Sequence, residues 1–435
     1  MSPILVSMKK LGILVGGGPA PGINSVIGAA TIRACLSGVE VVGIQEGYRW
    51  LMEGDTSHVT PLTIAETSRI HFRGGSTLGT SRANPTKNPE HLAAALGALQ
   101  RLGIGMLISI GGDDTCFSAH SLAKASGGTL RVVHVPKTID NDLDLPLEVP
   151  TFGFTTARSV GVGIVQNLMT DAKTTGRWYF VVAMGRKAGH LALGIGKAAG
   201  ATVSLIPEEF AKNPRLSLIV DTLAGSIIKR LGHGRSYGVA VLAEGLVEIL
   251  PESDLSALAN VERDEHDHIR IAEVDFGEIV KLAVRKRLTE LGVKATLVAK
   301  NLGYELRCAD PVPSDMEYTR DLGYCAARYV IEGGSHALIT MINGVFRPVP
   351  FDEIMDPKTG RMRVRMVNLE SDRYRIARTY MIRLRAGDLD DAAEMGRMAA
   401  VIKKTPDEFR REFEQVFLTD LEPIKSMSGR PPPVA

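Results

Sequence analysis

Residues 11–36 have the sequence LGILVGGGPAPGINSVIGAATIRACL, in which an apolar run, a glycine-rich turn and a helical pattern follow one another. This order is typical of a strand, a turn and a helix in an open α/β sheet, where ligands bind beyond the carboxyl ends of the strands. Glycines there let backbone amides approach an anion, and the helix N-terminus favours negative charge. A tight structural turn explains Gly16, Gly17 and Gly18 about as well as a phosphate does. The turn has neither the G-x-G-x-x-G nor the Walker A spacing.

The alternation of short apolar runs and helical patterns continues along the chain. Residues 105–110 and 132–135 are continuously apolar, which is typical of parallel strands covered on both faces. A helix is predicted over residues 316–332, ended by Gly333 and Gly334. We therefore expect an α/β fold, with a second α/β layer system over about residues 151–305. Further strands are predicted at residues 39–44, 178–184, 202–206, 236–243, 297–306 and 336–342.

Composition excludes several classes of protein. The 435 residues include 51 Lys and Arg against 49 Asp and Glu, and a net charge of +2 is too balanced for a protein that coats nucleic acid. With 44% apolar and 23% charged residues the chain is globular, and its length predicts two or three domains. Glycine is enriched, with 45 residues or about 10% of the chain against roughly 7% in typical proteins. The positions of these glycines in the chain therefore help to locate candidate ligand-binding turns.

The few cysteines and the lack of a long apolar segment predict the compartment. Cys35, Cys116, Cys308 and Cys325 have no C-x-x-C spacing and are too sparse to crosslink the chain. A reducing environment fits them. No run reaches the roughly 20 apolar residues that span a bilayer. We expect a cytoplasmic protein with no membrane partner.

A second glycine turn, GGDDT at residues 111–115, follows the predicted strand at 105–110. Two carboxylates at a strand end can hold Mg²⁺, which prefers oxygen ligands and bridges phosphates. Asp113 or Asp114 could instead cap the following helix, although Thr115 could cap it equally well. Both interpretations remain open at this point.

A third strand end carries PKTIDND, residues 136–142. A carboxylate in such a loop can take the proton of an acceptor hydroxyl in phosphoryl transfer, with a lysine nearby for charge. Ordinary turn-forming Asp and Asn residues are the alternative, and an isolated loop of this kind would favour it.

Two more strand ends complete the pattern. MGRKAGH, residues 184–190, places cations and an imidazole at a strand-to-helix turn, as a sugar phosphate would require. AEG, residues 243–245, ends another strand with a carboxylate that could accept hydrogen bonds from sugar hydroxyls. Each motif alone is weak. Five strand-end clusters of glycine, carboxylates and cations are difficult to attribute to turns alone.

A basic segment near the C-terminus, residues 358–385, contains Arg361, Arg363 and Arg365 at a period of two. This alternation could line a nucleic-acid groove, but it more readily indicates an edge strand with one solvated face. Residues 428–435 are predicted to be a flexible tail.

Together, these motifs resemble those of the phosphofructokinase family. GGGPAPGINSVI resembles the family's first glycine loop, GGDD its second and PKTIDNDL its catalytic loop. MGRKAGHLAL and AEG resemble its sugar-phosphate loops, and LGYELRCADPVPSD its late substrate motif. The resemblance runs in order from about Gly12 to Gly334, roughly three quarters of the chain. It implies two three-layer αβα domains with largely parallel sheets facing a cleft.

Two positions bear on the phosphoryl donor. ATP-using members usually have GGDG and PGTIDND, whereas this chain has Asp114 and Lys137 at the variable positions. A carboxylate at 114 would repel the α-phosphate of ATP, and Lys137 can neutralise charge on the leaving group of pyrophosphate. The resemblance is therefore to the pyrophosphate-dependent subgroup. It implies reversible, Mg²⁺-dependent phosphorylation of the 1-hydroxyl of fructose 6-phosphate. The alternatives are an ATP-dependent 6-phosphofructokinase and a non-catalytic sugar-phosphate or nucleic-acid-binding regulator.

The resemblance also implies roles for single residues. Asp140 is expected to be the catalytic base, Lys137 and Asp114 to act at the donor, and Asp113 to lie at the Mg²⁺ position. Tyr304 stands where members often have histidine, and Val298 where short ATP-dependent members have a second intersubunit arginine. The expected donor-binding residues are Gly17, Gly18, Arg82, Asp114 and Lys137, and the expected substrate-binding residues are Thr138, Ile139, Asp140, Asp142, Arg177, Met184, Gly185, Arg186, Glu244, Tyr304 and Arg307.

Family resemblance further suggests how the chain is organised. We expect a donor-binding domain formed by residues 1–150 and about 306–360, and a fructose 6-phosphate-binding domain formed by 151–305 with part of 361–427. Arg177 matches an arginine that the family lends from a neighbouring subunit, which implies a homodimer or homotetramer. Residues beyond about 345 exceed the ending of the short members and have no expected role.

Overall fold

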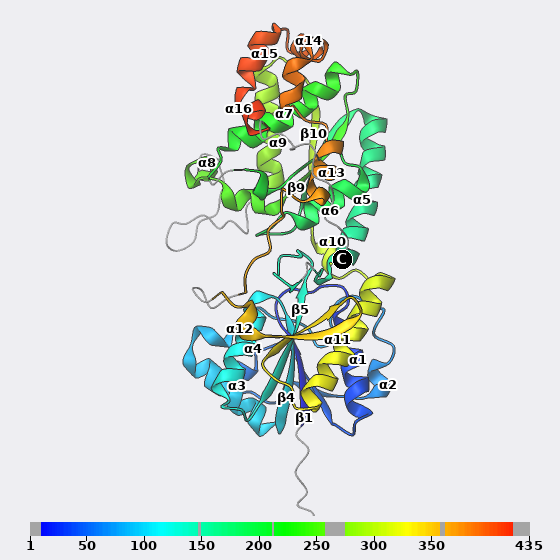
Figure 1. Ribbon diagram of the computed structural model, residues 1–435, viewed down its shortest axis with the longest axis vertical. Helices are drawn as coiled ribbons and strands as arrows, with labels where there is room; N and C mark the ends of the chain where they lie inside the picture. The colour runs from blue at the N-terminus through cyan, green and yellow to red at the C-terminus, as the bar shows by residue number, and fades with distance from the viewer. Residues whose placement is uncertain (1–9, 147–148, 211–212, 257–274, 357–361, 421–435) are drawn as a thin grey trace, which may run out of the picture. The chain divides into compact units, whose positions relative to one another are not determined.

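The computed structural model describes residues 10–146, 149–210, 213–256, 275–356 and 362–420, and the predicted tail at 428–435 lies outside them. The chain forms two compact units. Unit 1 comprises Met1–Val160 and Gly303–Arg365, and unit 2 comprises Gly161–Leu302 and Met366–Ala435. Each unit therefore combines two separate stretches of chain, which the colours of Figure 1 make visible.

Unit 1 is built on a mostly parallel sheet with the strand order β12-β11-β5-β4-β1-β2-β3, and β6 pairs with β5. The pairs β2–β3 and β11–β12 are antiparallel, so the antiparallel strands lie at the two edges. Strand β4 is buried along its whole length, as its continuously apolar sequence predicts. The strands are β1 (Lys10–Val15), β2 (Val41–Ile44), β3 (Val59–Leu62), β4 (Ile104–Gly111), β5 (Arg131–Thr138), β6 (Phe152–Gly153), β11 (Ala337–Ile342) and β12 (Val345–Pro350).

Helices cover both faces of this sheet. In Figure 1, α3 and α4 lie on one side of the sheet and α1 and α11 on the other. The helix α5 (Phe154–Thr175) begins in unit 1 and continues into unit 2. The other helices of unit 1 are α1 (Ile23–Cys35), α2 (Ile64–Thr67), α3 (Pro89–Arg101), α4 (Asp113–Ala125), α10 (Tyr304–Arg307), α11 (Pro313–Ile331) and α12 (Phe351–Ile354).

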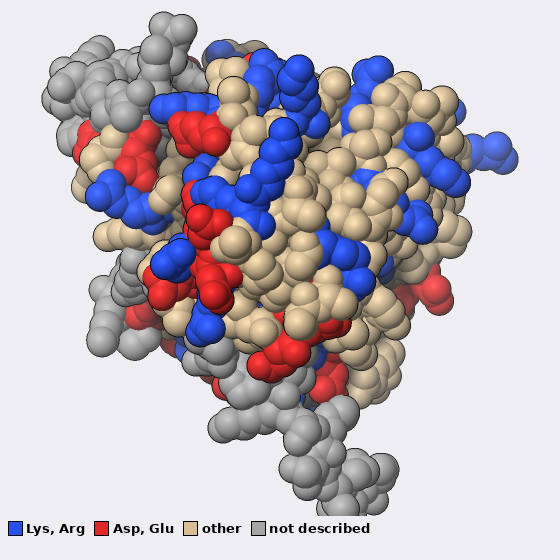
Figure 2. Space-filling view, turned by 90° about the horizontal axis from the view of Figure 1, so that it is seen from above, with Lys and Arg blue, Asp and Glu red and all other residues tan. Residues whose placement is uncertain are grey.

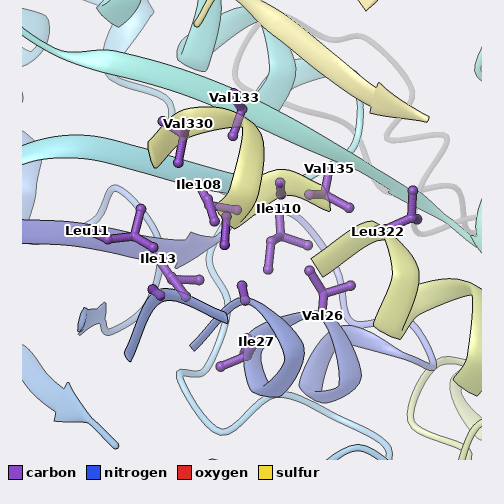
Figure 3. Close-up of a cluster of buried hydrophobic side chains, with 14 of the residues drawn as sticks. Leu11, Ile13, Val26, Ile27, Ile108, Ile110, Val133, Val135, Leu322 and Val330 are labelled. Atoms are coloured by element: carbon purple, nitrogen blue, oxygen red, sulfur yellow. The ribbon is translucent and has the colours of Figure 1, made fainter. Parts of the chain in front are cut away.

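The core between the sheet and the α1/α11 layer holds the strand ends in place. Strand side chains such as Ile13, Ile108 and Val135 meet Val26 of α1 and Leu322 of α11, and all of them are fully buried (Figure 3). Close packing of this kind leaves little freedom to the loops that leave the carboxyl ends of β1, β4 and β5.

Unit 2 has its own parallel sheet, with the order β10-β7-β9-β8. None of the described helices of the chain is long and apolar enough to cross a membrane. The strands are β7 (Arg177–Ala183), β8 (Val203–Leu205), β9 (Gly238–Ala243) and β10 (Thr296–Leu302). The helices are α6 (His190–Ala199), α7 (Leu216–Gly232), α8 (Glu252–Ser256), α9 (Phe276–Glu290), α13 (Asp372–Tyr380), α14 (Ala392–Val401), α15 (Pro406–Glu412) and α16 (Glu414–Thr419).

The predicted α/β class and the largely parallel sheets are confirmed, and two local predictions are wrong. The strand predicted over residues 297–306 ends at Leu302, because Gly303 leads into the short helix α10. Residues 363–365 form no extended edge strand, and only Val364 makes an isolated bridge, to Leu143. Arg361 lies outside the described residues.

Candidate active site

The first glycine loop follows β1 and is tied to residue 81. The Gly17 amide donates to the Ser81 carbonyl over 2.7 Å, and Gly17 has a φ of +81°, which favours glycine. A Cβ atom at Gly16 would lie 2.5 Å from the Thr115 hydroxyl oxygen. The side chain of Thr115 therefore fills the space that only glycine leaves open.

In the second loop, GGDD, the two aspartates begin helix α4. Gly112 is the N-cap residue and makes no side-chain cap, so Asp113 and Asp114 stand in the first helical turn. The structure thus excludes the capping alternative for Asp113, Asp114 and Thr115. Asp114 is exposed. Negative charge in this turn is favoured by the helix dipole.

Behind this loop, a fully buried histidine fixes the end of β4. The His134 Nε2 atom lies 3.0 Å from the Gly111 carbonyl oxygen, and Nδ1 lies 3.4 Å from the Ser109 hydroxyl. Burial lowers the pKa of His134 to about 3, so the ring is neutral and can donate one proton to Gly111. Pro136, opposite Gly111 in the ladder, has no amide proton to offer.

The first and third loops meet at Lys137. Its ammonium group donates a hydrogen bond to the Gly18 carbonyl oxygen, and the residue is buried, with only 5% of its surface exposed. Burial lowers the pKa of Lys137 to about 8, Asp140 acts to raise it, and Arg307 and Arg82 act to lower it further. A Cβ at Gly18 would lie 3.2 Å from Arg307 Nη1. Three cations thus surround the glycine loop, and such a group attracts phosphate.

Arg307 and Arg82, two of these three cations, have different surroundings beside the first glycine loop. The guanidinium of Arg307 stacks over the ring of Tyr304, 4.6 Å from its centroid, and Tyr304 is exposed. The Nε atom of Arg307 is buried and has no hydrogen-bond partner among the described residues. Arg82 is exposed and directly follows Ser81, which bridges to Gly16.

The PKTIDND loop is fixed by its own side chains. The Thr138 hydroxyl accepts the Asp140 amide proton over 3.0 Å and donates to the Asp142 carboxylate over 3.3 Å. Asn141 has a φ of +57°, and its side-chain oxygen accepts the Thr151 amide proton over 3.0 Å. Asp140 is half-buried, whereas the Ile139 side chain is buried. Ile139 can therefore meet a ligand only through its backbone.

A segment that the sequence left without a role reaches the same loops. The buried guanidinium of Arg365 donates to the Asn141 carbonyl, and the Met362 amide donates to the Asp113 carboxylate over 3.0 Å. Residues more than 200 positions apart in the chain make these contacts. No local sequence signal predicts them.

In unit 2 the MGR and AEG motifs lie together at the ends of β7 and β9. The Glu244 carboxylate accepts the Gly185 amide proton over 3.2 Å, and the Gly245 amide donates to the Gly185 carbonyl over 3.0 Å. The Met184 amide donates to the Leu302 carbonyl of the neighbouring strand. Arg186 is exposed. The ends of the neighbouring strands β7 and β9 therefore offer an exposed cation, Arg186, and a carboxylate, Glu244.

Arg177 stands apart from these residues within unit 2. It begins β7, whereas Met184 follows the end of this seven-residue strand, so the two lie roughly 20 Å apart. Its guanidinium is 3.9 Å from the Asp171 carboxylate, which also accepts the Tyr179 hydroxyl proton. Arg177 cannot join Met184, Gly185 and Arg186 around one ligand in the same unit.

The sequence of most of the α/β core matches a known family model. Residues 10–330 match the model described as phosphofructokinase. The chain belongs to the phosphofructokinase family. The loops at residues 16–22, 111–115, 136–142, 184–190 and 243–245 all lie within the matched residues, whereas Met362 and Arg365 lie beyond them.

Similar proteins extend the match to nearly the whole chain. A pyrophosphate–fructose 6-phosphate 1-phosphotransferase of Thermotoga maritima is 50% identical over 93% of this chain and 98% of its own length. A protein of the same name from Naegleria fowleri is 49% identical over 94% of this chain and 96% of its own length. A solved pyrophosphate-dependent phosphofructokinase from Nitrosospira multiformis has the same fold, with a TM-score of 0.65 at 17% identity over 91% of this chain and 92% of that one.

Proposed function

We propose that this phosphofructokinase reversibly transfers a phosphoryl group from pyrophosphate to the 1-hydroxyl of fructose 6-phosphate, giving fructose 1,6-bisphosphate and phosphate. The observation that carries the proposal is the pair Asp114 and Lys137. Asp114 stands in the first turn of α4, just after β4, and Lys137 lies near the end of the adjacent strand β5 and against the first glycine loop. The names of the relatives at 50% and 49% identity support the same donor.

Pyrophosphate, rather than ATP, suits the charges at this place. An exposed carboxylate at Asp114 repels the α-phosphate that ATP would add to the two phosphates shared by both donors. Lys137, against the Gly18 carbonyl, supplies positive charge where the leaving phosphate develops negative charge. An ATP-dependent 6-phosphofructokinase is the alternative, and it requires ATP to bind despite Asp114.

Asp140 is proposed as the general base, with Thr138, Ile139 and Asp142 ordering the loop and the sugar. The carboxylate takes the proton of the 1-hydroxyl as its oxygen attacks the terminal phosphorus of pyrophosphate, and phosphate leaves in line. Its place in a loop held by Thr138 and Asp142 supports this role. Gly17, Gly18, Arg82 and Lys137 then bind the donor, so that catalysis consists mainly of positioning and charge neutralisation.

The proposed cofactor is Mg²⁺. Among the described residues no group of three or more His, Cys, Asp and Glu is placed to hold a metal by itself. A site of one or two carboxylates, with substrate phosphates and water completing the shell, is nonetheless what Mg²⁺ prefers. Asp113 in the first turn of α4 fits this set and would hold the ion. When bound, Mg²⁺ neutralises charge on the donor oxygens.

Residues at two other places are proposed for the acceptor. Met184, Gly185, Arg186 and Glu244 offer backbone groups, a cation and a carboxylate that suit fructose 6-phosphate. Tyr304 and Arg307, whose side chains stack on one another, are also proposed as acceptor residues. Arg177 is proposed to serve a neighbouring subunit, because its distance from Met184 prevents both from serving one site within unit 2. This requires a homodimer or homotetramer.

Unit 1 is proposed to bind the donor and unit 2 the sugar phosphate, in a cytoplasmic enzyme of glycolysis and gluconeogenesis. The two cations proposed to bind the donor, Arg82 and Lys137, both belong to unit 1, which supports the assignment. The free cysteines Cys35, Cys116, Cys308 and Cys325 suit a reducing compartment.

A non-catalytic regulator is the remaining alternative. On the face shown in Figure 2, Lys and Arg side chains gather mainly over the upper and right part, and Asp and Glu side chains lie mainly at the left and bottom. The net charge of +2 gives no general attraction to a polyanion, which argues against the nucleic-acid version. We propose no nucleic-acid or membrane partner.

Steady-state assays with each donor test the proposal. Purified protein with Mg²⁺ and fructose 6-phosphate should form fructose 1,6-bisphosphate with pyrophosphate and far more slowly with ATP. Substantial turnover with ATP and none with pyrophosphate would reverse the assignment of the donor.

A further inference from the structure

We propose that Arg365 is a positioning residue for the phosphoryl transfer, acting by holding the backbone of the loop that carries Asp140. The inference rests on the proposed function only in taking Asp140 as the base, and it applies to either donor. Arg365 lies beyond residues 10–330, which match the family model, so the family match itself gives it no role.

The contacts of the guanidinium are directed at the turn that follows Asp140. Its Nε and Nη2 atoms each donate to the Asn141 carbonyl over 3.1 Å, and Nη2 also donates to the Asn141 side-chain oxygen. The Nη1 atom donates to the Val149 carbonyl over 3.0 Å. Arg365 is 9% exposed and Asn141 is 4% exposed, so water can replace these bonds only in part.

Asn141 is the residue of the loop that most needs such support. Its φ of +57° is a left-handed conformation, which costs free energy for a residue with a side chain. The conformation turns its carbonyl toward Arg365 and its side-chain oxygen toward the Thr151 amide. Asp140 directly precedes this turn, so a change at Asn141 moves the proposed base.

Residues 362–365, called the 362–365 segment below, also bind through their backbone. They contact the PKTIDND loop and its continuation to Asp144, and the start of α4 after the GGDD turn. The Arg365 amide donates to the Asp142 carbonyl over 2.8 Å, and the Asp144 amide donates to the Arg363 carbonyl over 3.2 Å. At the start of the segment, the Met362 amide donates to the Asp113 carboxylate. The segment therefore links the proposed base loop to the proposed metal ligand.

A guanidinium suits this position better than other side chains. Its planar fork directs several N–H groups at once, whereas the ammonium of lysine is a single point charge. The lysine of Arg365→Lys should therefore be unable to donate hydrogen bonds to the Asn141 and Val149 carbonyls at the same time. A displacement of Asp140 of about 1 Å is sufficient to lower the rate about 10²-fold.

The experiment compares Arg365→Ala and Arg365→Lys with Arg363→Ala in the full chain, using whichever donor the wild-type enzyme turns over. Arg363 is a matched control, because it lies in the same segment, is half exposed and pairs with Asp144 over 3.1 Å. We expect Arg365→Ala to lower kcat about 10²-fold, with KM for both substrates changed only a few-fold. We expect Arg363→Ala to keep kcat near the wild-type value.

Two further measurements separate positioning from general support of the fold. Guanidine added at millimolar concentration should restore part of the kcat of Arg365→Ala and should not affect Arg363→Ala. In an Asp140→Asn background, Arg365→Ala should lower the residual rate little further, because the group that it positions is already gone. If Arg365→Ala does not fold, Arg365→Lys carries the comparison with Arg363→Ala and the test in the Asp140→Asn background, with a loss of at least about tenfold expected.

Equal kcat in the Arg365 and Arg363 variants, or a full additional loss in the Asp140→Asn background, would overturn the proposal. Wild-type activity with ATP instead of pyrophosphate would overturn the proposed donor, yet would leave the comparison of the Arg365 variants intact. The two failures are therefore distinguishable.

Discussion

The ammonium group of Lys137 donates a hydrogen bond to the Gly18 carbonyl oxygen and thereby joins the ends of β5 and β1. These strands belong to one sheet, with β4 between them. The bond puts a buried positive charge against the glycine loop that is proposed to bind pyrophosphate. Burial lowers the pKa of the Lys137 ammonium group.

Lys137 should therefore limit activity on the alkaline side. Its pKa of about 8 in the free enzyme means that the ammonium loses its proton as the pH rises through this value, and binding of the anionic donor weakens. We expect kcat/KM for pyrophosphate to fall above about pH 8, because this ratio reports the free enzyme. In Lys137→Arg the fall should be absent, since a guanidinium stays charged. A fall of the same size at the same pH in Lys137→Arg would assign the titration to another group.

Asp140→Asn should remove the base while keeping the shape of the loop. The amide is isosteric with the carboxylate but does not take the proton of the acceptor hydroxyl. General base catalysis contributes about 10²–10⁴-fold, so we expect kcat to fall by that factor, with a smaller effect on sugar-phosphate binding. Single-turnover kinetics and calorimetry with fructose 6-phosphate measure the two effects. Retained kcat would mean that another residue is the base.

Asp114→Gly should let ATP bind measurably, because the substitution removes both the charge and the side chain at an exposed position of the first helical turn. Asp114→Asn is the matched control, since it removes the charge and keeps the volume. Calorimetry with ATP and Mg²⁺ distinguishes the two effects. If neither variant binds nucleotide, exclusion of ATP does not depend on Asp114.

Asp315→Ala should destabilise unit 1. The buried Asp315 carboxylate accepts the Thr156 amide and hydroxyl protons over 2.7 and 2.6 Å, at the start of α5. Leaving buried donors unpaired costs about 1–3 kcal/mol of unfolding free energy. Denaturant unfolding followed by circular dichroism measures it, with Asp321→Ala on the exposed side of the same helix as the control. An equal, small change in both variants would show that the Thr156 contacts contribute little.

Much of the fold was predictable because its signals are local. The run, turn and helix at residues 11–36 predicted β1, the glycine loop and α1 almost to the residue. The strand-end loops of unit 1 meet because parallel strands share one edge of the sheet, and so Lys137 reaches Gly18.

Contacts between distant segments were not predictable in the same way. Arg361, Arg363 and Arg365 alternate as in an edge strand, yet Arg365 is buried against Asn141, 224 positions earlier in the chain. An alternating sequence pattern predicts which side chains lie on the same face of a strand. It does not predict which distant carbonyl oxygen one of these side chains binds. Similarly, the apolar pattern at residues 297–306 hides the change from strand to helix at Gly303.

The proposed function is tested most directly by the transfer of labelled phosphate from ³²P-pyrophosphate to fructose 6-phosphate by the purified enzyme with Mg²⁺. We predict that one labelled phosphate appears in fructose 1,6-bisphosphate for each labelled phosphate released. Label that appears only as inorganic phosphate, or label that reaches the sugar from γ-³²P-ATP and never from pyrophosphate, would contradict the account.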